Sequence, residues 1–380
     1  MSQSIMFVVG DPSGDHHTAP VLAALRAQFP DLRTFGIGGP NMQRAGFETL
    51  LPFAEFNRMG FWEVISHLPF FLDAKKRLIR ELDRCRPSAL VCVDYPGFNI
   101  PLMKAAHSRN VCVIWYIVPQ VWAWKKARAR ILGEHAAFIG TVFPFEKELF
   151  APFPASVDFV GHPLIEALGE NERFAPLCTE DQALRERFEQ GRLRISLVPG
   201  SRRQEIGHML EPMAQATGLL AQKYPGIALK VSRSGSIPVE DIAARIKGKR
   251  IEIYDGPLDD LLAQTDLALV TSGTATLQTA LWHIPMVICY KTSPLSYHVL
   301  KNVVSIDMIG MPNIISRRTI VPECIQHEVC ARKLYSRLHD FMSSWNRYSA
   351  TILNLSHLRR ELGSKRPSTQ IAAQIAAFLV

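Results

Sequence analysis

The sequence predicts an α/β protein made of two successive Rossmann-like, doubly wound sheets of parallel strands. Short continuous apolar runs, typical of strands buried on both faces, alternate with longer segments of helical period. The chain has 380 residues against roughly 150 for a typical domain, so two or three domains fit. Hydrophobic residues make up 47% and charged residues 21%, an ordinary globular composition that excludes disordered and fibrous classes.

The predicted strands fall into two sets, separated by a polar, charged stretch that ends near Arg194. The segment Ala19–Phe29 is an example of the helices expected between strands. We therefore predict a first domain over residues 1–165 and a second over residues 190–345, joined by a linker. The predicted strands are Ile5–Val9, Leu32–Ile37, Ala89–Val93, Val111–Ile117 and Phe138–Val142, followed by Ile195–Leu197, Ala228–Val231, Ile251–Tyr254, Leu267–Val270 and Pro285–Tyr290.

Composition also indicates where the protein works and what it meets. The net charge of +8 favours anionic partners such as phosphates and acidic lipids, but does not resemble that of a nucleic-acid-coating protein. The 7 cysteines include no Cys-x-x-Cys pair and are expected to be small buried hydrophobes in a reducing compartment. The N-terminal apolar run is too short for a signal peptide, and no apolar stretch reaches the roughly 18 residues that span a bilayer. We expect a cytoplasmic protein.

Ligands of doubly wound sheets bind beyond the carboxyl ends of the strands, so two such halves predict a ligand in the crevice between them. Gly10–Asp15 follows the first predicted strand. Ser13 or Asp15 can cap the next helix, and the glycines allow a ligand to approach closely. Gly36–Pro40 follows the second strand in the same way. A tight turn and a flexible loop explain these two segments equally well.

Asp94 directly follows the predicted strand Ala89–Val93, within the segment Asp94–Asn99. A carboxylate at the carboxyl end of a strand is well placed to act as a general base. With the ordinary pKa of about 3.9 an aspartate is a weak base, so this role requires positioning and partial desolvation. The alternative is an aspartate that only accepts backbone N–H groups in the turn before Pro96.

Two tryptophans, Trp122 and Trp124, lie in the segment Pro119–Lys125 and precede a run of basic residues. They could stack against a sugar or anchor the protein at a membrane interface. Core aromatic residues beside a solvated basic face would give the same pattern.

Two loops of the second half are suited to phosphate. Leu197–Arg203 leads from a strand through glycine to a helix start, where free N–H groups and the guanidinium of Arg202 could bind a diphosphate. Thr271–Gln278 repeats this arrangement after the strand Leu267–Val270. Metal ligation is poorly supported, because the adjacent pair His16-His17 faces different ways and no His-Glu-x-x-His motif occurs. We expect no metal and no cofactor.

The apolar segment Met59–Leu72, which includes Phe70 and Phe71, precedes four basic residues. Bunched apolar residues followed by bases are typical of peripheral attachment to an anionic membrane and could admit acyl chains. The alternative is a helix pair buried in the core of the first domain. The four bases are Lys75, Lys76, Arg77 and Arg80.

In this order, the motifs closely resemble the lipid A disaccharide synthase family, bacterial inverting glycosyltransferases of the GT-B type. The resemblance covers nearly the whole chain. It is carried by Gly10–Asp15, Gly36–Pro40, Met59–Val64, Asp94–Asn99, Pro119–Lys125, Phe143–Glu146, Phe159–Pro163, Pro199–Arg202, Ser272–Leu277, Met311–Ile315 and Val321–Glu323.

This resemblance implies a GT-B-like fold whose two Rossmann-like domains face a central cleft, with a C-terminal helix at about 366–380 packed back on the first domain. It implies transfer of diacylglucosamine from UDP to the 6-hydroxyl of diacylglucosamine 1-phosphate. The products would be a β-1,6-linked lipid A disaccharide 1-phosphate and UDP. The enzyme would work at the cytoplasmic face of the inner membrane, without a nucleic-acid partner. Neither acyl-chain length nor oligomeric state follows from the sequence.

By the same resemblance, Asp94 is the catalytic base and Arg202 contacts phosphate. Three positions depart from the family pattern: Asp11 and Gln278 stand where Glu is usual, and Val118 where Ser is common. An amide at Gln278 can still bind a ribose, so weaker nucleotide binding is expected rather than none. The substrate-binding candidates are Ser13, Gly14, Asn99, Gln120, Ser201, Ser272, Gly273, Thr274, Gln278, Asn313, Glu323 and Gln326.

Two other functions compete with this one. Another GT-B protein that uses a UDP-sugar, such as an epimerase or a peptidoglycan-type transferase, would need no lipid-docking segment. A catalytically idle UDP-sugar-binding membrane protein would have no need of Asp94 or Arg202.

Overall fold

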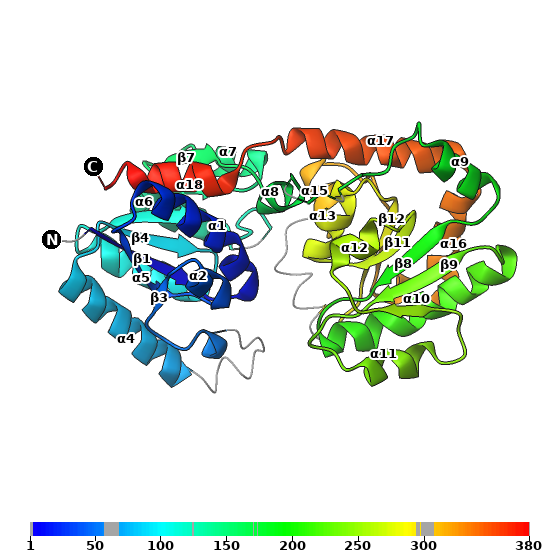
Figure 1. Cartoon of the computed structure of the whole chain (residues 1–380), viewed down its shortest axis with the longest axis horizontal. Helices are drawn as coiled ribbons and strands as arrows, with labels where there is room; N and C mark the ends of the chain where they lie inside the picture. The colour runs from blue at the N-terminus through cyan, green and yellow to red at the C-terminus, as the bar shows by residue number, and fades with distance from the viewer. Residues whose placement is uncertain are drawn as a thin grey trace. The chain divides into compact units, whose positions relative to one another are not determined.

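The computed structural model describes residues 3–56, 68–123, 125–169, 171–172, 174–293, 297 and 308–379. The chain divides into two compact units, each built around a parallel β-sheet with helices on both faces (Figure 1). Unit 1 comprises Met1–Ala167 and Ser364–Val380, and unit 2 comprises Leu168–Gly363. The predicted α/β class with two doubly wound sheets is therefore confirmed.

The sheet of unit 1 is entirely parallel, with strand order β3-β2-β1-β4-β5-β6-β7. The order reverses between β1 and β4, so the loops that leave these neighbouring strands diverge to opposite faces. Such a switch point is where open α/β sheets bind ligands. The strands are β1 (Ser4–Val9), β2 (Arg33–Ile37), β3 (Glu48–Thr49), β4 (Ala89–Val93), β5 (Cys112–Tyr116), β6 (Phe138–Thr141) and β7 (Ser156–Phe159).

The last helix of the chain belongs to unit 1. In Figure 1 it is the red helix α18, and it packs against α1. Glu166 of α8 holds the start of α18 in place, because its carboxylate accepts the N–H of Ser368 at 3.0 Å and pairs with Arg366 at 3.1 Å. The helices of this part are α1 (Pro12–Gln28), α2 (Pro40–Arg44), η1 (Phe53–Glu55), α4 (Leu68–Cys85), α5 (Pro96–His107), α6 (Ala127–His135), η2 (Pro144–Glu146), α7 (Lys147–Phe150), α8 (Pro163–Gly169) and α18 (Pro367–Ala376).

Unit 2 repeats the design with strand order β10-β9-β8-β11-β12-β13, again parallel, and with its switch point between β8 and β11. Its strands are β8 (Arg194–Val198), β9 (Ala228–Ser232), β10 (Glu252–Tyr254), β11 (Leu267–Thr271), β12 (Met286–Tyr290) and β13 (Glu323–Ile325). Its helices are α9 (Gln182–Glu189), α10 (Arg203–Lys223), α11 (Val239–Ile246), α12 (Leu258–Leu262), α13 (Thr274–Leu281), α15 (Met311–Ile315), η3 (Gln326–Glu328), α16 (Ala331–Met342) and α17 (Trp345–Glu361).

All ten predicted strands are present within one or two residues of their predicted ends. Their apolar runs are buried on both faces, as in β4 and β11, whose residues are all buried. Three further strands, β3, β7 and β13, were not predicted; they are short and lie at sheet edges. Edge strands are partly exposed and carry polar residues, so they lack the apolar run that marks a central strand.

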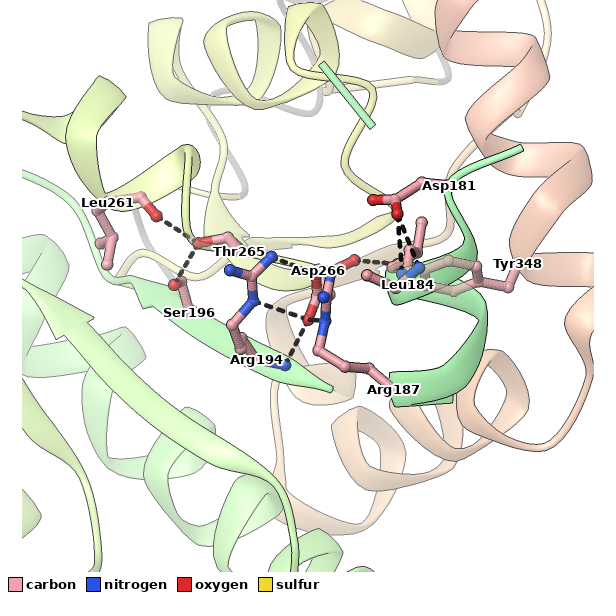
Figure 2. Close-up of polar contacts among 10 residues, drawn as sticks. Asp181, Leu184, Arg187, Arg194, Ser196, Leu261, Thr265, Asp266 and Tyr348 are labelled. Atoms are coloured by element: carbon pink, nitrogen blue, oxygen red, sulfur yellow. Dashed lines mark hydrogen bonds and ion pairs between the residues drawn. The ribbon is translucent and has the colours of Figure 1, made fainter. Parts of the chain in front are cut away.

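The stretch expected to be a linker is instead part of unit 2. Asp181 caps α9, whose Leu184 is fully buried in the core. Figure 2 shows Arg187 of α9 and Arg194 of β8 converging on the buried carboxylate of Asp266. The Tyr348 hydroxyl donates to the Asp266 carbonyl at 2.6 Å. The predicted boundary at residue 190 is therefore wrong, because these long-range contacts recruit polar residues that look like a linker in sequence.

Among the helices of the described ranges, none combines the length and apolar content that would let it cross a bilayer. All seven cysteines are free. Cys92, Cys289 and Cys324 are buried as expected, whereas Cys178 is exposed.

Candidate functional site

The segment that follows β1 contains two aspartates, Asp11 and Asp15, with different structural roles. Asp11 is the N-cap of α1 and accepts the N–H of Gly14 at 2.9 Å. Asp15 is buried and accepts the N–H groups of Gly39 at 2.8 Å and Met42 at 3.1 Å, which fixes the loop after β2. The prediction that Ser13 or Asp15 caps this helix is therefore wrong: Ser13 is exposed in the first turn of α1.

Gly14 is buried against the ends of the two central strands. A Cβ at this position would lie 2.8 Å from the Val9 side chain and 2.7 Å from Asp11. Glycine is thus needed here for close packing between α1 and the sheet. The structure places Gly14 within the protein rather than on a surface open to substrate.

Asp94 lies where β4 ends, beside the unit 1 switch point. Its backbone is left-handed, with φ +41, and its N–H donates to the carbonyls of Tyr116 and Ile117 at 3.1 and 3.2 Å. The side chain is partly exposed. Burial and, to a smaller extent, the nearby charge of Asp11 raise the pKa of Asp94 to about 7, although the charge of Arg128 opposes this shift. An aspartate with such a pKa can accept a proton near neutral pH.

Asn99, an expected substrate-binding residue, is fully buried, and its Oδ1 has no partner in the described part of the chain. Its Nδ2 group donates to the carbonyls of Asp94 at 2.8 Å and Val8 at 3.2 Å. The amide therefore joins the ends of β1 and β4. From its buried position, Asn99 holds the backbone of Asp94 in place.

The loop after β5 contains an exposed Gln120 and a half-buried Trp122. The indole Nε1 of Trp122 donates to Glu146 Oε1 at 3.2 Å. Glu146 was not among the predicted site residues. The sequence did carry a signal for it, because Glu146 follows a predicted strand within the aromatic segment Phe143–Glu146. Trp124 lies outside the described residues.

In unit 2, the loop after β8 presents the donors predicted for diphosphate. Ser201 and the side chain of Arg202 are exposed, and Gly200 has φ +107, a conformation that favours glycine. The carboxylate of Glu205 accepts the N–H groups of Ser201 at 3.0 Å and Arg202 at 3.3 Å. An internal carboxylate thus already satisfies these anion-binding groups.

The second predicted phosphate loop follows β11, which neighbours β8 across the switch point. Gly273 is the N-cap of α13, and both Gly273 and Thr274 are exposed. Ser272 donates its hydroxyl to the carbonyl of Ile309 at 2.8 Å, while Gln278 is partly exposed on α13. The fold therefore brings the loops after β8 and β11 to the same end of the sheet, as the analysis predicted from their places after strands.

Asn313 and Glu323 form a network of hydrogen bonds beside Ser272, whereas Gln326 bonds separately to Thr292. Glu323 accepts the N–H groups of Ile309 and Gly310 and the Asn313 side-chain amide at 2.7 Å. Asn313 is fully buried, and its Oδ1 accepts two further N–H groups. Gln326 accepts the N–H of Thr292 at 3.2 Å, and its buried Nε2 has no partner within the described part of the chain. Asn313 is thus a scaffold residue, contrary to prediction.

The proposed docking segment is described only from Leu68 onward, and its part at 57–67 lies outside the described residues. Phe70 and Phe71 are half-buried and contact Phe56 edge-to-face, with ring centroids 5.1 and 5.8 Å apart. These two rings pack against the core without the complete burial that the alternative interpretation would require. Leu68 and Leu72 are the exposed apolar residues, at 53% and 45%.

Within the described ranges, no group of three or more His, Cys, Asp or Glu side chains is arranged to hold a metal ion.

Solved structures of an epimerase and of a glycosyltransferase share this fold. A UDP-GlcNAc 2-epimerase from Neisseria meningitidis, solved with UDP-GlcNAc, matches with a TM-score of 0.64 at 12% identity, over 99% of both chains. The calicheamicin glycosyltransferase CalG4 matches with a TM-score of 0.64 at 14% identity, over 100% of this chain and 99% of that one. The architecture therefore defines a protein of the GT-B class.

Sequence comparison then identifies the family. Residues 5–376 match the lipid-A-disaccharide synthetase family. The lipid-A-disaccharide synthase of Geobacter sulfurreducens is 33% identical over 381 residues, covering 100% of this chain and 98% of the relative. That of Syntrophus aciditrophicus is 32% identical, covering 95% and 94%. The chain belongs to the lipid-A-disaccharide synthetase family and is a glycosyltransferase of lipid A biosynthesis that uses a UDP-sugar donor and a lipid acceptor.

Proposed function

We propose that the protein joins UDP-2,3-diacylglucosamine to 2,3-diacylglucosamine 1-phosphate. The products are the β-1,6-linked disaccharide 1-phosphate and UDP. The observation that carries this proposal is the position of the two predicted catalytic groups. Asp94 follows β4 at the switch point of unit 1, and Arg202 follows β8 at the switch point of unit 2.

Asp94 acts as the general base in this proposal. The acceptor 6-hydroxyl oxygen attacks the anomeric carbon of the donor from the face opposite UDP. Its proton passes to the Asp94 carboxylate as the new C–O bond forms and the bond from the anomeric carbon to the diphosphate oxygen breaks. A pKa of about 7 suits this role, because a base is most effective when its pKa lies near the working pH.

Unit 2 binds the departing UDP. The N–H groups of Ser201 and Arg202, together with the Arg202 guanidinium, stabilise the negative charge that develops on the diphosphate. Ser272, Gly273, Thr274 and Gln278 supply further contacts to UDP from the neighbouring loop. Exposed Ser13 and Gln120 remain candidates for contact with the acceptor on unit 1.

We further propose that α4 attaches the enzyme to the anionic inner-membrane surface. Leu68, Leu72, Lys76 and Arg80 recur at four-residue spacing on this helix, and all four are exposed. Residues four apart lie on one helix face, so two leucines can enter the head-group region while two bases meet acidic lipids. Attachment there gives the enzyme access to the acyl chains of its substrates. Removing such a chain from a bilayer costs about 0.8 kcal/mol of free energy per CH₂.

Product analysis tests the reaction. The purified chain is incubated with the two diacylated substrates, and the products are identified by mass spectrometry. Formation of the disaccharide 1-phosphate and UDP is expected. An isomerised UDP-sugar in place of a disaccharide would identify an epimerase and overturn the proposal, as would an unchanged mixture.

Substitution of the base tests the mechanism. Asp94→Asn should lower kcat by roughly 10²-fold or more, with UDP affinity nearly unchanged, because the amide cannot accept the proton. Asp31→Asn, at an exposed aspartate, is the matched control and should retain full activity. Near-normal turnover by Asp94→Asn would exclude Asp94 as the base.

A further inference from the structure

Glu146 is a buried carboxyl group to which the proposed reaction assigns no part. The residue ends η2 and is 1% exposed. Its Oε2 accepts the N–H groups of Val142 at 3.2 Å and Phe143 at 3.1 Å, while its Oε1 accepts the indole N–H of Trp122 at 3.2 Å. Because burying a polar group is costly unless it is hydrogen-bonded, three converging donors indicate a specifically built contact.

This contact joins two loops at the carboxyl ends of the strands, in the same sheet that positions Asp94. Trp122 follows β5 and Glu146 follows β6, and β4, β5 and β6 are consecutive parallel neighbours. Loops that follow parallel strands all leave from the carboxyl ends of those strands, on the same side of the sheet. Electrostatics agree with this placement, because burial and, to a much smaller extent, the charge of Asp94 raise the pKa of Glu146 to about 8.

The hydrogen bond also fixes an aromatic surface. Trp122 and Phe145 are half-buried, and their rings meet edge-to-face with centroids 5.7 Å apart. Phe145 stacks on the buried Phe143 at 5.7 Å with an interplanar angle of 8°. Because Glu146 accepts the indole N–H, the part of Trp122 left exposed offers aromatic carbon rather than a donor. Aromatic carbon can pack against the C–H-rich face of a pyranose ring.

We propose that Glu146 is a positioning residue that holds the Trp122 indole ring as a platform for the sugar ring of the acceptor, beside Asp94. The proposal rests on the proposed function for the identity of that sugar. It assigns a specificity-determining role to the aromatic ring, and a supporting role to the carboxyl group beneath it.

The first test observes Trp122 directly. The full chain is labelled with ¹⁵N-tryptophan, and the Trp122 indole resonance is assigned by its loss in Trp122→Phe. Diacylglucosamine 1-phosphate in detergent micelles should shift this resonance, whereas micelles alone should not. A resonance that responds equally to both, or to neither, would overturn the proposal. This measurement needs no turnover, so an absence of product formation would refute the proposed function without deciding the role of Trp122.

The second test separates positioning from folding. Trp122→Leu should raise KM for the acceptor about five- to tenfold while UDP affinity stays unchanged, because the aromatic ring is lost. Tm should fall as well, because the buried Glu146 carboxylate loses one of its three donors. Glu146→Gln leaves one acceptor oxygen for three donors, so it should move the Trp122 resonance in the free protein and raise the same KM. Glu148→Gln, at an exposed carboxylate two residues away, is the matched control. An unchanged acceptor KM in Trp122→Leu would overturn the proposal even if Glu146→Gln failed to fold.

Discussion

Glu205 forms an ion pair with Arg202 at 2.9 Å, and the same carboxylate accepts the backbone N–H groups at the start of α10. The carboxylate therefore occupies the donors that we assign to the UDP diphosphate. For the nucleotide to bind these groups, its phosphates must displace or share this internal anion.

The first prediction concerns this competition. Glu205→Gln should tighten UDP binding about two- to fivefold, because the exchange removes a competing ion pair that is largely exposed and thus weak. Arg202→Ala should weaken UDP binding and slow transfer. Isothermal titration with UDP measures both, with Tm as the control for the lost helix cap. Weaker UDP binding by a folded Glu205→Gln protein would contradict this prediction.

The second prediction is a pH dependence set by Asp94. The base must be ionised to accept a proton, so with a pKa of about 7 the value of kcat/KM should fall about tenfold for each pH unit below 7. An aspartate with its ordinary pKa would show no such fall above pH 5.

The charge of Asp11 contributes to this pKa, which supplies a second variant. Asp11→Asn removes that charge while asparagine keeps the N-cap of α1, so the acidic limb should move to lower pH. Steady-state rates from pH 5 to 9 measure both profiles. A limb that stays in place in Asp11→Asn would show that another group controls the rate.

The third prediction concerns the stability of unit 2. Asp266→Asn should lower the free energy of unfolding by about 3 kcal/mol, because Arg187 and Arg194 would lose the buried charge that pairs with them. Glu189→Gln is the control, since it breaks the exposed pair with Arg185 and should cost less than about 1 kcal/mol. Urea unfolding measures both. Equal losses in the two variants would refute the special role of Asp266.

The fourth prediction tests membrane attachment by α4. The double variant of Leu68→Ser and Leu72→Ser should remain folded and lose flotation with anionic vesicles, since both side chains are exposed. The matched control replaces two exposed leucines of unit 2, Leu219 and Leu353, by serine. Binding of the unmodified protein should also weaken at high salt. Full flotation of the α4 variant would exclude this helix as the docking surface.

The sequence by itself determined ten of the strands and the places of the motifs between them. Central parallel strands are buried on both faces, so their apolar runs stand out without any knowledge of their neighbours. Because chemical groups of open α/β sheets follow strands, Asp94 and Arg202 could be located before the fold was known. The family resemblance rested on the same segments, and the match over residues 5–376 confirms it.

The tertiary structure decided which polar residues are exposed and which are buried. Asn99, Asn313 and Glu146 all stand in promising motifs, yet each is buried and hydrogen-bonded to groups of its surroundings, although the Oδ1 of Asn99 has no partner in the described part of the chain. Their burial depends on packing between elements that the sequence does not display as neighbours. The raised pKa of Asp94 has the same origin, because desolvation and the charge of a residue 83 positions earlier, Asp11, exist only in the folded chain.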